Sequence, residues 1–312
     1  MPDATTYRLV TRSDFDGLVS AVLLKSKGLI DDVLFVHPKD VQDGKIPISA
    51  RDITTNLPYV PECHLCFDHH TSEVLRVAGE AKGNLVLDPH APSAARVVWN
   101  HFGGASAFPD ISDEMMAAVD KADSAEFTQD DVLTPSGWVL LSFLVDSRTG
   151  LGRFREFTIS NYSLMMELVE YCRHDTAEQV LARPHVAERV HVYREHEAQF
   201  KAQVQRCTTM HGKLAVYDLR NEETIFAGNR FMLYALFPAC NISATVMWGL
   251  KKQNTVIAIG KSIFDRTAKT DVGALCLSYG GGGHIAAGTC QPPTDQAERV
   301  LGEIIAKIMK DG

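Results

Sequence analysis

Two short segments in the N-terminal half carry carboxylates and imidazoles at spacings that suit metal binding. Asp14 and Asp16 stand two residues apart in a loop that follows an apolar stretch. Asp68, His69 and His70 follow a second apolar stretch in the same way. Carboxylate oxygens and imidazole nitrogens are ligands for divalent cations, and neighbouring groups can fix the tautomer of a ligating ring. The two segments together predict a metal-dependent reaction centre.

Alternating strands and helices must position these segments. The spacing of apolar residues predicts an α/β domain with a parallel sheet covered on both faces. Ligands bind at the carboxyl ends of parallel strands, and we expect the acidic segments to meet there. The expected strands are 7–10, 33–36 and 64–67, and the expected helices are 18–27 and 94–102.

The remainder of the chain predicts a helical extension, a connecting helix and a second, smaller α/β domain. Residues 114–200 have mostly helical periodicity, and the polar stretch 186–206 is typical of a long exposed linker helix. We therefore place a metal-binding catalytic domain at 1–185 and a substrate-binding domain at 207–312. In the latter we expect strands at 213–218, 242–248 and 255–260, and helices at 230–237 and 293–309.

Composition limits the class of protein. The 312 residues are 45% hydrophobic and 22% charged, which is ordinary for globular domains. A net charge of −8 argues against binding of duplex DNA, which needs clustered Lys and Arg. Seven cysteines, an odd number, fit reduced thiols, and no apolar run approaches membrane-spanning length. We expect a cytoplasmic protein with no membrane partner, and a homodimer is plausible.

The order of the acidic motifs resembles a known family. Asp-x-Asp, a single Asp52, Asp-His-His and a late Asp, either Asp120 or Asp123, follow the layout of the DHH phosphoesterase superfamily. The glycine-rich segment 280–284, which ends in His, is similar to the DHHA1 substrate-binding domain of that superfamily. The resemblance covers most of the chain, in the branch of exopolyphosphatase-related and oligoribonuclease-like proteins.

This resemblance implies a centre of two metal ions with Asp52 shared between them. One ion would be held by Asp14, Asp52 and a further group. The second ion would be held by Asp16, Asp52, His69 and Asp123, with Asp120 as the competing candidate for the last position. The mixture of carboxylates with one imidazole favours manganese, with magnesium as the rival.

The resemblance also implies roles for the residues beside the metals. His70 would stabilise charge in the transition state or assist the leaving group. Asp68 would orient His69 or His70.

One departure concerns the first metal site. Relatives carry a His two or four residues before the position of Asp14, where this chain has Arg12 and Val10. Either Arg12 supplies a positive charge and the first site is weakly occupied, or His37 replaces the missing ligand.

Glycines and arginines of the C-terminal half are the candidates for substrate binding. A glycine run lets backbone N–H groups approach a phosphate, and arginine suits bidentate phosphate recognition. The candidates are Asn229, Arg230, Ser262, Arg266, Gly281, Gly282, Gly283 and His284.

The leading functional hypothesis is a metal-dependent phosphodiesterase or phosphatase. Its substrate would be a short oligonucleotide, a linear or cyclic dinucleotide, or 3′-phosphoadenosine 5′-phosphate, cleaved by a water that two metals activate. A polyphosphatase is the first alternative. The second is a nucleotide sensor with weakened catalysis, which the presence of Arg12 motivates.

Overall fold

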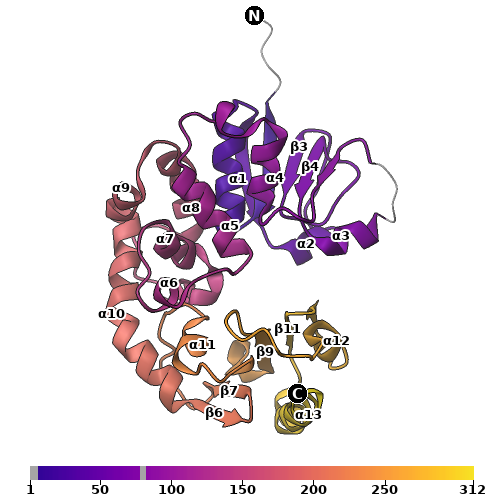
Figure 1. Cartoon of the computed structure of the whole chain (residues 1–312), viewed down its shortest axis with the longest axis vertical. Helices are drawn as coiled ribbons and strands as arrows, with labels where there is room; N and C mark the ends of the chain where they lie inside the picture. The colour runs from indigo at the N-terminus through magenta and orange to yellow at the C-terminus, as the bar shows by residue number, and fades with distance from the viewer. Residues whose placement is uncertain (1–5, 78–81) are drawn as a thin grey trace, which may run out of the picture. The chain divides into compact units, whose positions relative to one another are not determined.

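The computed structural model describes residues 6–77 and 82–312 and divides the chain into two compact units, Met1–Tyr193 and Arg194–Gly312. Each unit contains its own sheet (Figure 1). The division falls inside the long helix α10 (Pro184–Arg206). Among the helices of the described ranges, none combines the length and the apolarity that crossing a membrane requires.

The first unit is built on a five-stranded parallel sheet, as the sequence predicted. The strand order is β2-β1-β3-β4-β5, with β3 in the centre, and each neighbouring pair runs parallel. All five carboxyl ends therefore lie at one edge. The strands are β1 (Tyr7–Arg12), β2 (Ile30–Val36), β3 (Asp52–Thr55), β4 (Leu65–Asp68) and β5 (Leu85–Leu87).

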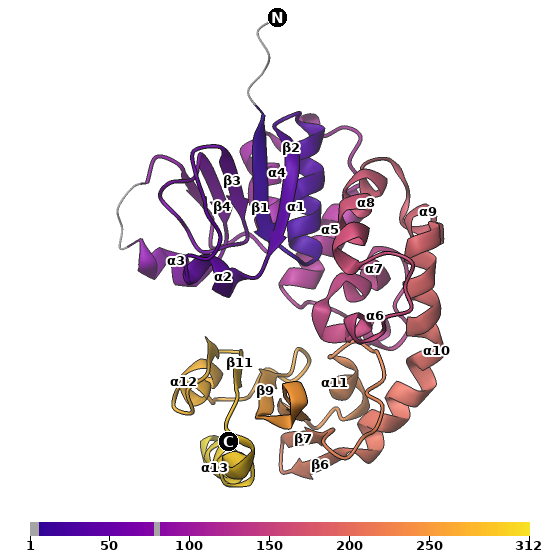
Figure 2. The ribbon, with the colours of Figure 1, turned by 180° about the vertical axis from the view of Figure 1, so that it is seen from behind.

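Different structures cover the two faces of this sheet. Helices α1 (Phe15–Ser26) and α4 (Ala94–His101) lie together on one face, which Figures 1 and 2 show from opposite sides. Around α2 (Pro38–Gln42), a small apolar cluster covers the strands β1 and β2; its buried members are Val10, Val36, Val41 and Leu57. A further short helix, α3 (Thr71–Arg76), follows β4.

The turn from β1 into α1 requires a glycine. A Cβ atom on Gly17 would lie 1.9 Å from the carbonyl oxygen of Arg12, so no larger residue fits without moving the backbone. Asp14 caps the helix by accepting a hydrogen bond from the Gly17 N–H at 3.0 Å. The Asp-x-Asp-Gly sequence is therefore required by the geometry of the turn as well as by its chemistry.

A helical extension completes the first unit. Helix α1 contacts α5 and α8 as well as α4, which explains why residues all around α1 are buried. Helix α7 packs against α5 and also contacts α1. The α-helices are α5 (Asp113–Asp123), α6 (Gln129–Leu133), α7 (Gly137–Val145), α8 (Asn161–His174) and α9 (Ala177–Ala182), and the 3-10 helices are η1 (Gly104–Ser106), η2 (Ser147–Thr149) and η3 (Leu151–Arg153).

The second unit is a mixed sheet with helices, which confirms the predicted α/β class. The strand order is β10-β11-β9-β8-β7-β6, and β7 and β8 are its parallel pair. Helices α12 (Val272–Leu277) and α13 (Ala297–Asp311) share one apolar core with the sheet. The remaining elements are β6 (Thr208–His211), β7 (Leu214–Asp218), α11 (Met232–Leu236), β8 (Ile242–Trp248), η4 (Leu250–Lys252), β9 (Thr255–Lys261), β10 (Gly282–His284), β11 (Ala287–Cys290) and η5 (Thr294–Gln296).

Candidate metal centre

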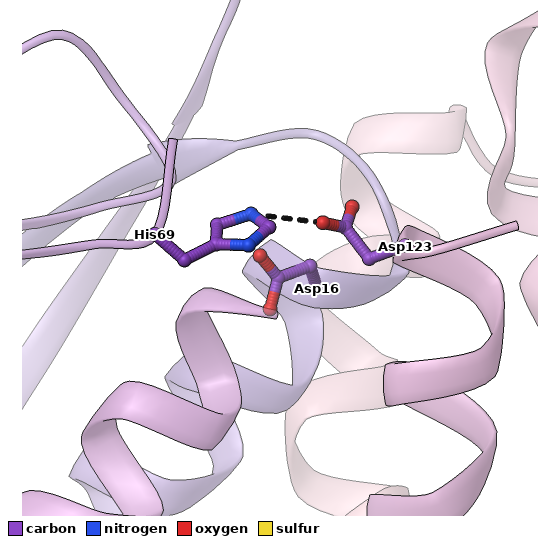
Figure 3. Close-up of side chains that lie close together, drawn as sticks. All are labelled: Asp16, His69 and Asp123. Carbon is purple, nitrogen blue, oxygen red and sulfur yellow. Dashed lines mark ion pairs between the residues drawn. The ribbon is translucent and has the colours of Figure 1, made fainter. Parts of the chain in front are cut away.

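Three side chains from distant parts of the sequence meet at the carboxyl edge of the first sheet. Asp16 lies in the first turn of α1, His69 directly follows β4, and Asp123 is the last residue of α5. One ligand atom from each of them lies within 4.8 Å of the others. Figure 3 shows the His69 ring directed at the Asp123 carboxylate with the Asp16 carboxylate beside it. This spacing suits one shared divalent cation.

The first turn of helix α4 holds the Asp16 carboxylate in place. Its Oδ2 accepts a hydrogen bond from the Ala94 N–H at 3.0 Å, and its Oδ1 accepts one from the Ala95 N–H at 2.7 Å. These amides belong to the helix N-terminus, where N–H groups lack partners within the helix and carboxylates are favoured. Both oxygens keep further lone pairs, so the Asp16 carboxylate is held in a fixed orientation and can still bind a cation.

His69 is fixed by a backbone carbonyl on the side away from the cluster. Its Nδ1 lies 3.1 Å from the carbonyl oxygen of Ala91, which assigns the proton to Nδ1 and leaves the Nε2 lone pair for a ligand. Nε2 lies 2.9 Å from Asp123 Oδ2, but it is buried and, among residues 6–77 and 82–312, has no partner in hydrogen-bond geometry. An oriented, buried nitrogen without a hydrogen bond is what a metal ligand requires.

The electrostatics of the cluster also fit a cation. Burial and the neighbouring Asp123 raise the pKa of Asp16 to about 8. Burial opposes protonation of His69, but the carboxylates of Asp123 and Asp16 outweigh it and raise the pKa of the imidazole to about 9. Carboxylates contribute to both shifts, so the cluster gathers negative charge that a proton can partly offset. A divalent ion would offset it more completely.

Asp14 lies in a different environment, because positive and polar groups already surround it. Arg12 Nε lies 2.8 Å from Asp14 Oδ2, and Asn56 Nδ2 lies 3.4 Å from Asp14 Oδ1. Burial raises the pKa of Asp14, and the Arg12 charge lowers it. His37, the alternative ligand, caps α2 instead, with Nδ1 accepting a hydrogen bond from the Lys39 N–H at 3.2 Å. Arg12 therefore occupies one side of the Asp14 carboxylate.

The prediction that Asp52 bridges two metals is wrong. Asp52 begins β3 instead of ending it, and its Cα pairs in the sheet with Arg8 near the start of β1. Asp52 Oδ1 lies 2.6 Å from Arg8 Nε, and Asp52 Oδ2 accepts a hydrogen bond from the Ser49 N–H at 2.7 Å. From Arg8 to Arg12 a strand spans about 13 Å, so Asp52 lies at the opposite edge of the sheet from His69.

A residue that the sequence reasoning missed stands where Asp52 was expected. Asn56 directly follows β3 at the carboxyl edge, beside Asp14, and adopts a positive φ of 54°. Its Oδ1 is buried and accepts no hydrogen bond within the described part of the chain. The signal was present in the β-branched run 53–55, which predicts a strand ending at Asn56. Asn56 is therefore a further polar group facing the candidate centre.

Of the two late aspartates, Asp123 lies in the cluster and Asp120 does not. Asp120 Oδ2 accepts a hydrogen bond from Arg96 Nε at 2.9 Å, and Asp120 Oδ1 accepts one from Ser93 Oγ at 2.8 Å. These bonds tie α5 to the start of α4. Asp120 therefore supports the helix whose amides hold Asp16.

Asp68 and His70 form a pair beside the cluster. Asp68 ends β4 and is buried, and its Oδ1 lies 2.8 Å from His70 Nδ1. This hydrogen bond, more than any other interaction, raises the pKa of His70. The His70 side chain is 43% exposed, so its other nitrogen is accessible from solvent. Asp68 therefore orients His70, while Ala91 orients His69.

The substrate-binding candidates of the second unit differ in what they do locally. Ser262 is buried, and its Oγ accepts hydrogen bonds from the N–H groups of Phe264 and Asp265, both at 3.1 Å. Arg266 in the same turn is exposed. Arg230 is also exposed, with its guanidinium 4.1 Å from the centroid of the Phe231 ring, and the preceding Asn229 is buried. Ser262 thus shapes a turn, whereas both arginines are exposed.

The glycine run forms a hairpin strand in the structure. Gly282, Gly283 and His284 make up β10, which pairs antiparallel with β11 and is exposed. A Cβ atom on Gly281 would lie 2.1 Å from the Thr289 carbonyl oxygen, and one on Gly283, which has a φ of 153°, would lie 2.3 Å from the Ala287 carbonyl oxygen. These two glycines are required by close backbone approach. His284 Nδ1 accepts a hydrogen bond from the Ala286 N–H at 3.3 Å.

Comparison with known proteins identifies the family. No family model matches the sequence, and a search of curated proteins gives no match. Among solved structures, CDC45 from Entamoeba histolytica has a TM-score of 0.52 at 9% identity over 98% of this chain and 95% of its own, which is a likeness of fold alone. The chain belongs to the DHH/DHHA1 phosphoesterase superfamily.

One similar structure within this class is much closer in sequence. It is PggH from Vibrio cholerae, a phosphodiesterase specific for pGpG, with 58% identity and a TM-score of 0.86. The match covers 98% of this chain and 100% of that one.

Proposed function

We propose that this protein is a phosphodiesterase that hydrolyses pGpG, a linear dinucleotide, to two molecules of GMP. The observation that carries the proposal is the full-length similarity to PggH at 58% identity, together with an acidic and histidine cluster built for a cation. Hydrolysis of a short nucleotide phosphodiester by a metal-dependent DHH enzyme is the general class, and pGpG is the specific substrate within it.

Asp16, His69 and Asp123 would hold a divalent cation. Two carboxylates and one imidazole suit manganese, with magnesium as the rival. A second ion beside Asp14 would have to compete with the Arg12 guanidinium, so we expect weaker binding there. Bound divalent cations supply an activated water and neutralise charge on a phosphate under attack.

His70 would serve as the proton donor. Its Nδ1 is committed to Asp68, which leaves Nε2 as the nitrogen that can present a proton to a leaving oxygen. The hydrogen bond that His70 donates to Asp68 raises the His70 pKa, so more of the ring carries that proton near neutral pH. Arg12, 36% exposed beside Asp14, would add positive charge where phosphate charge develops.

Residues of the second unit would bind the rest of the nucleotide. Arg230 and Arg266 are exposed and suit a terminal phosphate or a base edge. His284 and the exposed backbone of β10 are further candidates. Asn229, Ser262, Gly281 and Gly283 would act by shaping these segments, since each is buried or required by close contacts.

A substrate panel with added manganese tests this proposal. It consists of pGpG, a cyclic dinucleotide, 3′-phosphoadenosine 5′-phosphate and short polyphosphate, with product release followed by chromatography. We expect GMP from pGpG at a kcat/KM well above that for the other compounds. Preferred turnover of polyphosphate would favour a polyphosphatase, and tight nucleotide binding without turnover of any compound would favour a sensor. Light scattering would test the predicted homodimer.

A further inference from the structure

An arginine outside the predicted motifs stands close to the metal cluster. Arg148 lies in η2, directly after α7, and α7 packs against α5, whose last residue is Asp123. Burial lowers the pKa of the Arg148 guanidinium, but Asp146 outweighs burial and raises it, and the carboxylates of Asp14 and Asp123 raise it further. Arg148 therefore belongs to the same edge of the first unit as the candidate ligands.

The guanidinium of Arg148 is held on one side and open on the other. Asp146 Oδ1 accepts hydrogen bonds from Arg148 Nε at 2.7 Å and from the Arg148 N–H at 2.9 Å, and Asp146 Oδ2 lies 3.1 Å from Nε. Neither Nη atom has a hydrogen bond to any residue in 6–77 or 82–312, and the side chain is 49% exposed. The Nη edge is therefore oriented and available to a ligand.

The turn that carries Arg148 is itself well anchored. Thr149 is buried, and its Oγ1 donates a hydrogen bond to the Phe143 carbonyl oxygen at 2.6 Å, which ties the turn to the last part of α7. Leu151 after the turn is buried as well. A guanidinium on a fixed turn loses less freedom on binding an anion than one on a mobile loop.

We propose that Arg148 is a catalytic residue that contacts a nonbridging oxygen of the scissile phosphate, with Asp146 as its positioning residue. A planar guanidinium with a free Nη edge matches two phosphate oxygens. The neighbouring carboxylates repel a phosphate, and a fixed cation beside them offsets that repulsion. This inference rests on the proposed hydrolysis of a short nucleotide phosphodiester.

The test compares Arg148→Ala and Arg148→Lys with the wild type on pGpG in the presence of manganese. We expect Arg148→Ala to lower kcat/KM by roughly 10²-fold, in the range for loss of one transition-state donor. Arg148→Lys should recover part of the loss, and Asp146→Asn should lower kcat/KM less than Arg148→Ala. Manganese content should stay at the wild-type level. Arg155→Ala, an exposed arginine beyond the same turn, is the matched control and should keep wild-type activity.

A phosphorothioate readout separates direct contact from a structural effect. With sulfur at one nonbridging position of the scissile phosphate, the wild type should discriminate between the two diastereomers, and Arg148→Ala should lose part of that discrimination. An unchanged thio effect together with wild-type kcat/KM in Arg148→Ala would overturn the assignment and leave the proposed function intact.

Binding of product keeps the assignment testable even without turnover. If the wild type cleaves no dinucleotide, the proposed function fails, and GMP affinity with manganese, measured by calorimetry, then decides the role of Arg148. A loss of about tenfold in Arg148→Ala, with Arg155→Ala unchanged, would support a phosphate contact. Equal affinity in all three proteins would overturn it.

Discussion

The two aspartates of the Asp-x-Asp motif have different charged neighbours although only one residue separates them, and burial raises the pKa of both. Asp16 faces His69 and Asp123, and the two carboxylates raise the pKa of the His69 imidazole. Asp14 already has the Arg12 guanidinium against one oxygen and the Asn56 amide near the other. The Asp16 side of the candidate centre is therefore suited to a divalent cation, whereas on the Asp14 side the Arg12 guanidinium already supplies a positive charge.

The difference between Asp14 and Asp16 means that the residue type in a motif is not enough to identify a metal ligand. The contacts that orient the side chain matter as well. Backbone amides of α4 orient Asp16, and a carbonyl orients His69, so that unused lone pairs are directed at one point. One oxygen of Asp14, in contrast, accepts the hydrogen bond that caps α1. We therefore expect one strong metal site on the Asp16 side and a weaker one beside Asp14.

His69→Ala should have the largest effect on activity. Removing the imidazole takes away a neutral ligand and leaves Asp16 and Asp123 repelling each other. We expect a loss of about 10³-fold in kcat/KM, equivalent to about 4 kcal/mol of transition-state stabilisation. Manganese content measured by plasma emission should fall as well. His174→Ala, an exposed histidine at the end of α8, serves as the control. Retained metal and activity in His69→Ala would remove the Asp16 side from the centre.

Asp52→Asn should destabilise the fold without reducing metal binding. Asp52 is 1% exposed, but its partner Arg8 is 32% exposed, so the pair is only partly buried. Losing the charge from such a hydrogen-bonded pair costs roughly 2 kcal/mol in the free energy of unfolding. Urea denaturation at pH 7 measures that loss. Metal content should stay at the wild-type level; a clear loss of metal in the folded variant would restore Asp52 as a ligand.

The same variant makes a prediction about pH. Burial disfavours the Asp52 carboxylate, but its hydrogen bonds to Arg8 and Ser49 outweigh burial and lower its pKa. Its stabilisation is thus fully present above the unfolded-state pKa of about 3.9 and is lost as pH falls through the lower folded-state pKa. The stability difference between wild type and Asp52→Asn should therefore shrink below about pH 4, whereas a difference that grew in acid would contradict this assignment.

Asn56→Asp should strengthen the weaker side. A carboxylate at the end of β3 would add a charged ligand beside Asp14. We expect about a tenfold gain in affinity for the more weakly bound manganese, in the range for changes to groups that support a metal site, measured by calorimetric titration. Asn84→Asp, a change of the same kind in a different hydrogen-bond network, is the control. An unchanged weak-site affinity would place Asn56 outside the centre.

Arg12→His should have the smallest effect. It removes the guanidinium from Asp14 and supplies an imidazole in its place. We expect a few-fold rise in the affinity of the weaker ion, a shift of under about 1 kcal/mol. Activity can fall at the same time if Arg12 contacts phosphate, so metal titration is the deciding measurement. No change in weak-site affinity would exclude Arg12 as a competitor for the ion.

Much of the fold could be predicted from the pattern of apolar residues. Strands were expected at 33–36 and 64–67 and occur as β2 and β4, because continuous apolar runs bounded by polar turns suit strands buried on both faces. The short strand β3 was missed, since it begins with a charged residue and extends for only 4 residues. That omission caused the error at Asp52: without the strand, the edge on which Asp52 lies could not be deduced.

Three features of this protein can be predicted from the local sequence alone. The Asp-x-Asp-Gly turn, the buried run that leads into Asp68-His69-His70, and the glycines of β10 each follow from backbone sterics or apolar periodicity. Tertiary structure decided the rest. Asp123 rather than Asp120 reaches the cluster because of how α5 packs on α1. Asn56 lies beside Asp14 because chain segments far apart in sequence converge at one sheet edge. The physical reason is that a side chain's identity sets what it can bind, whereas packing across the whole domain sets which other side chains it meets.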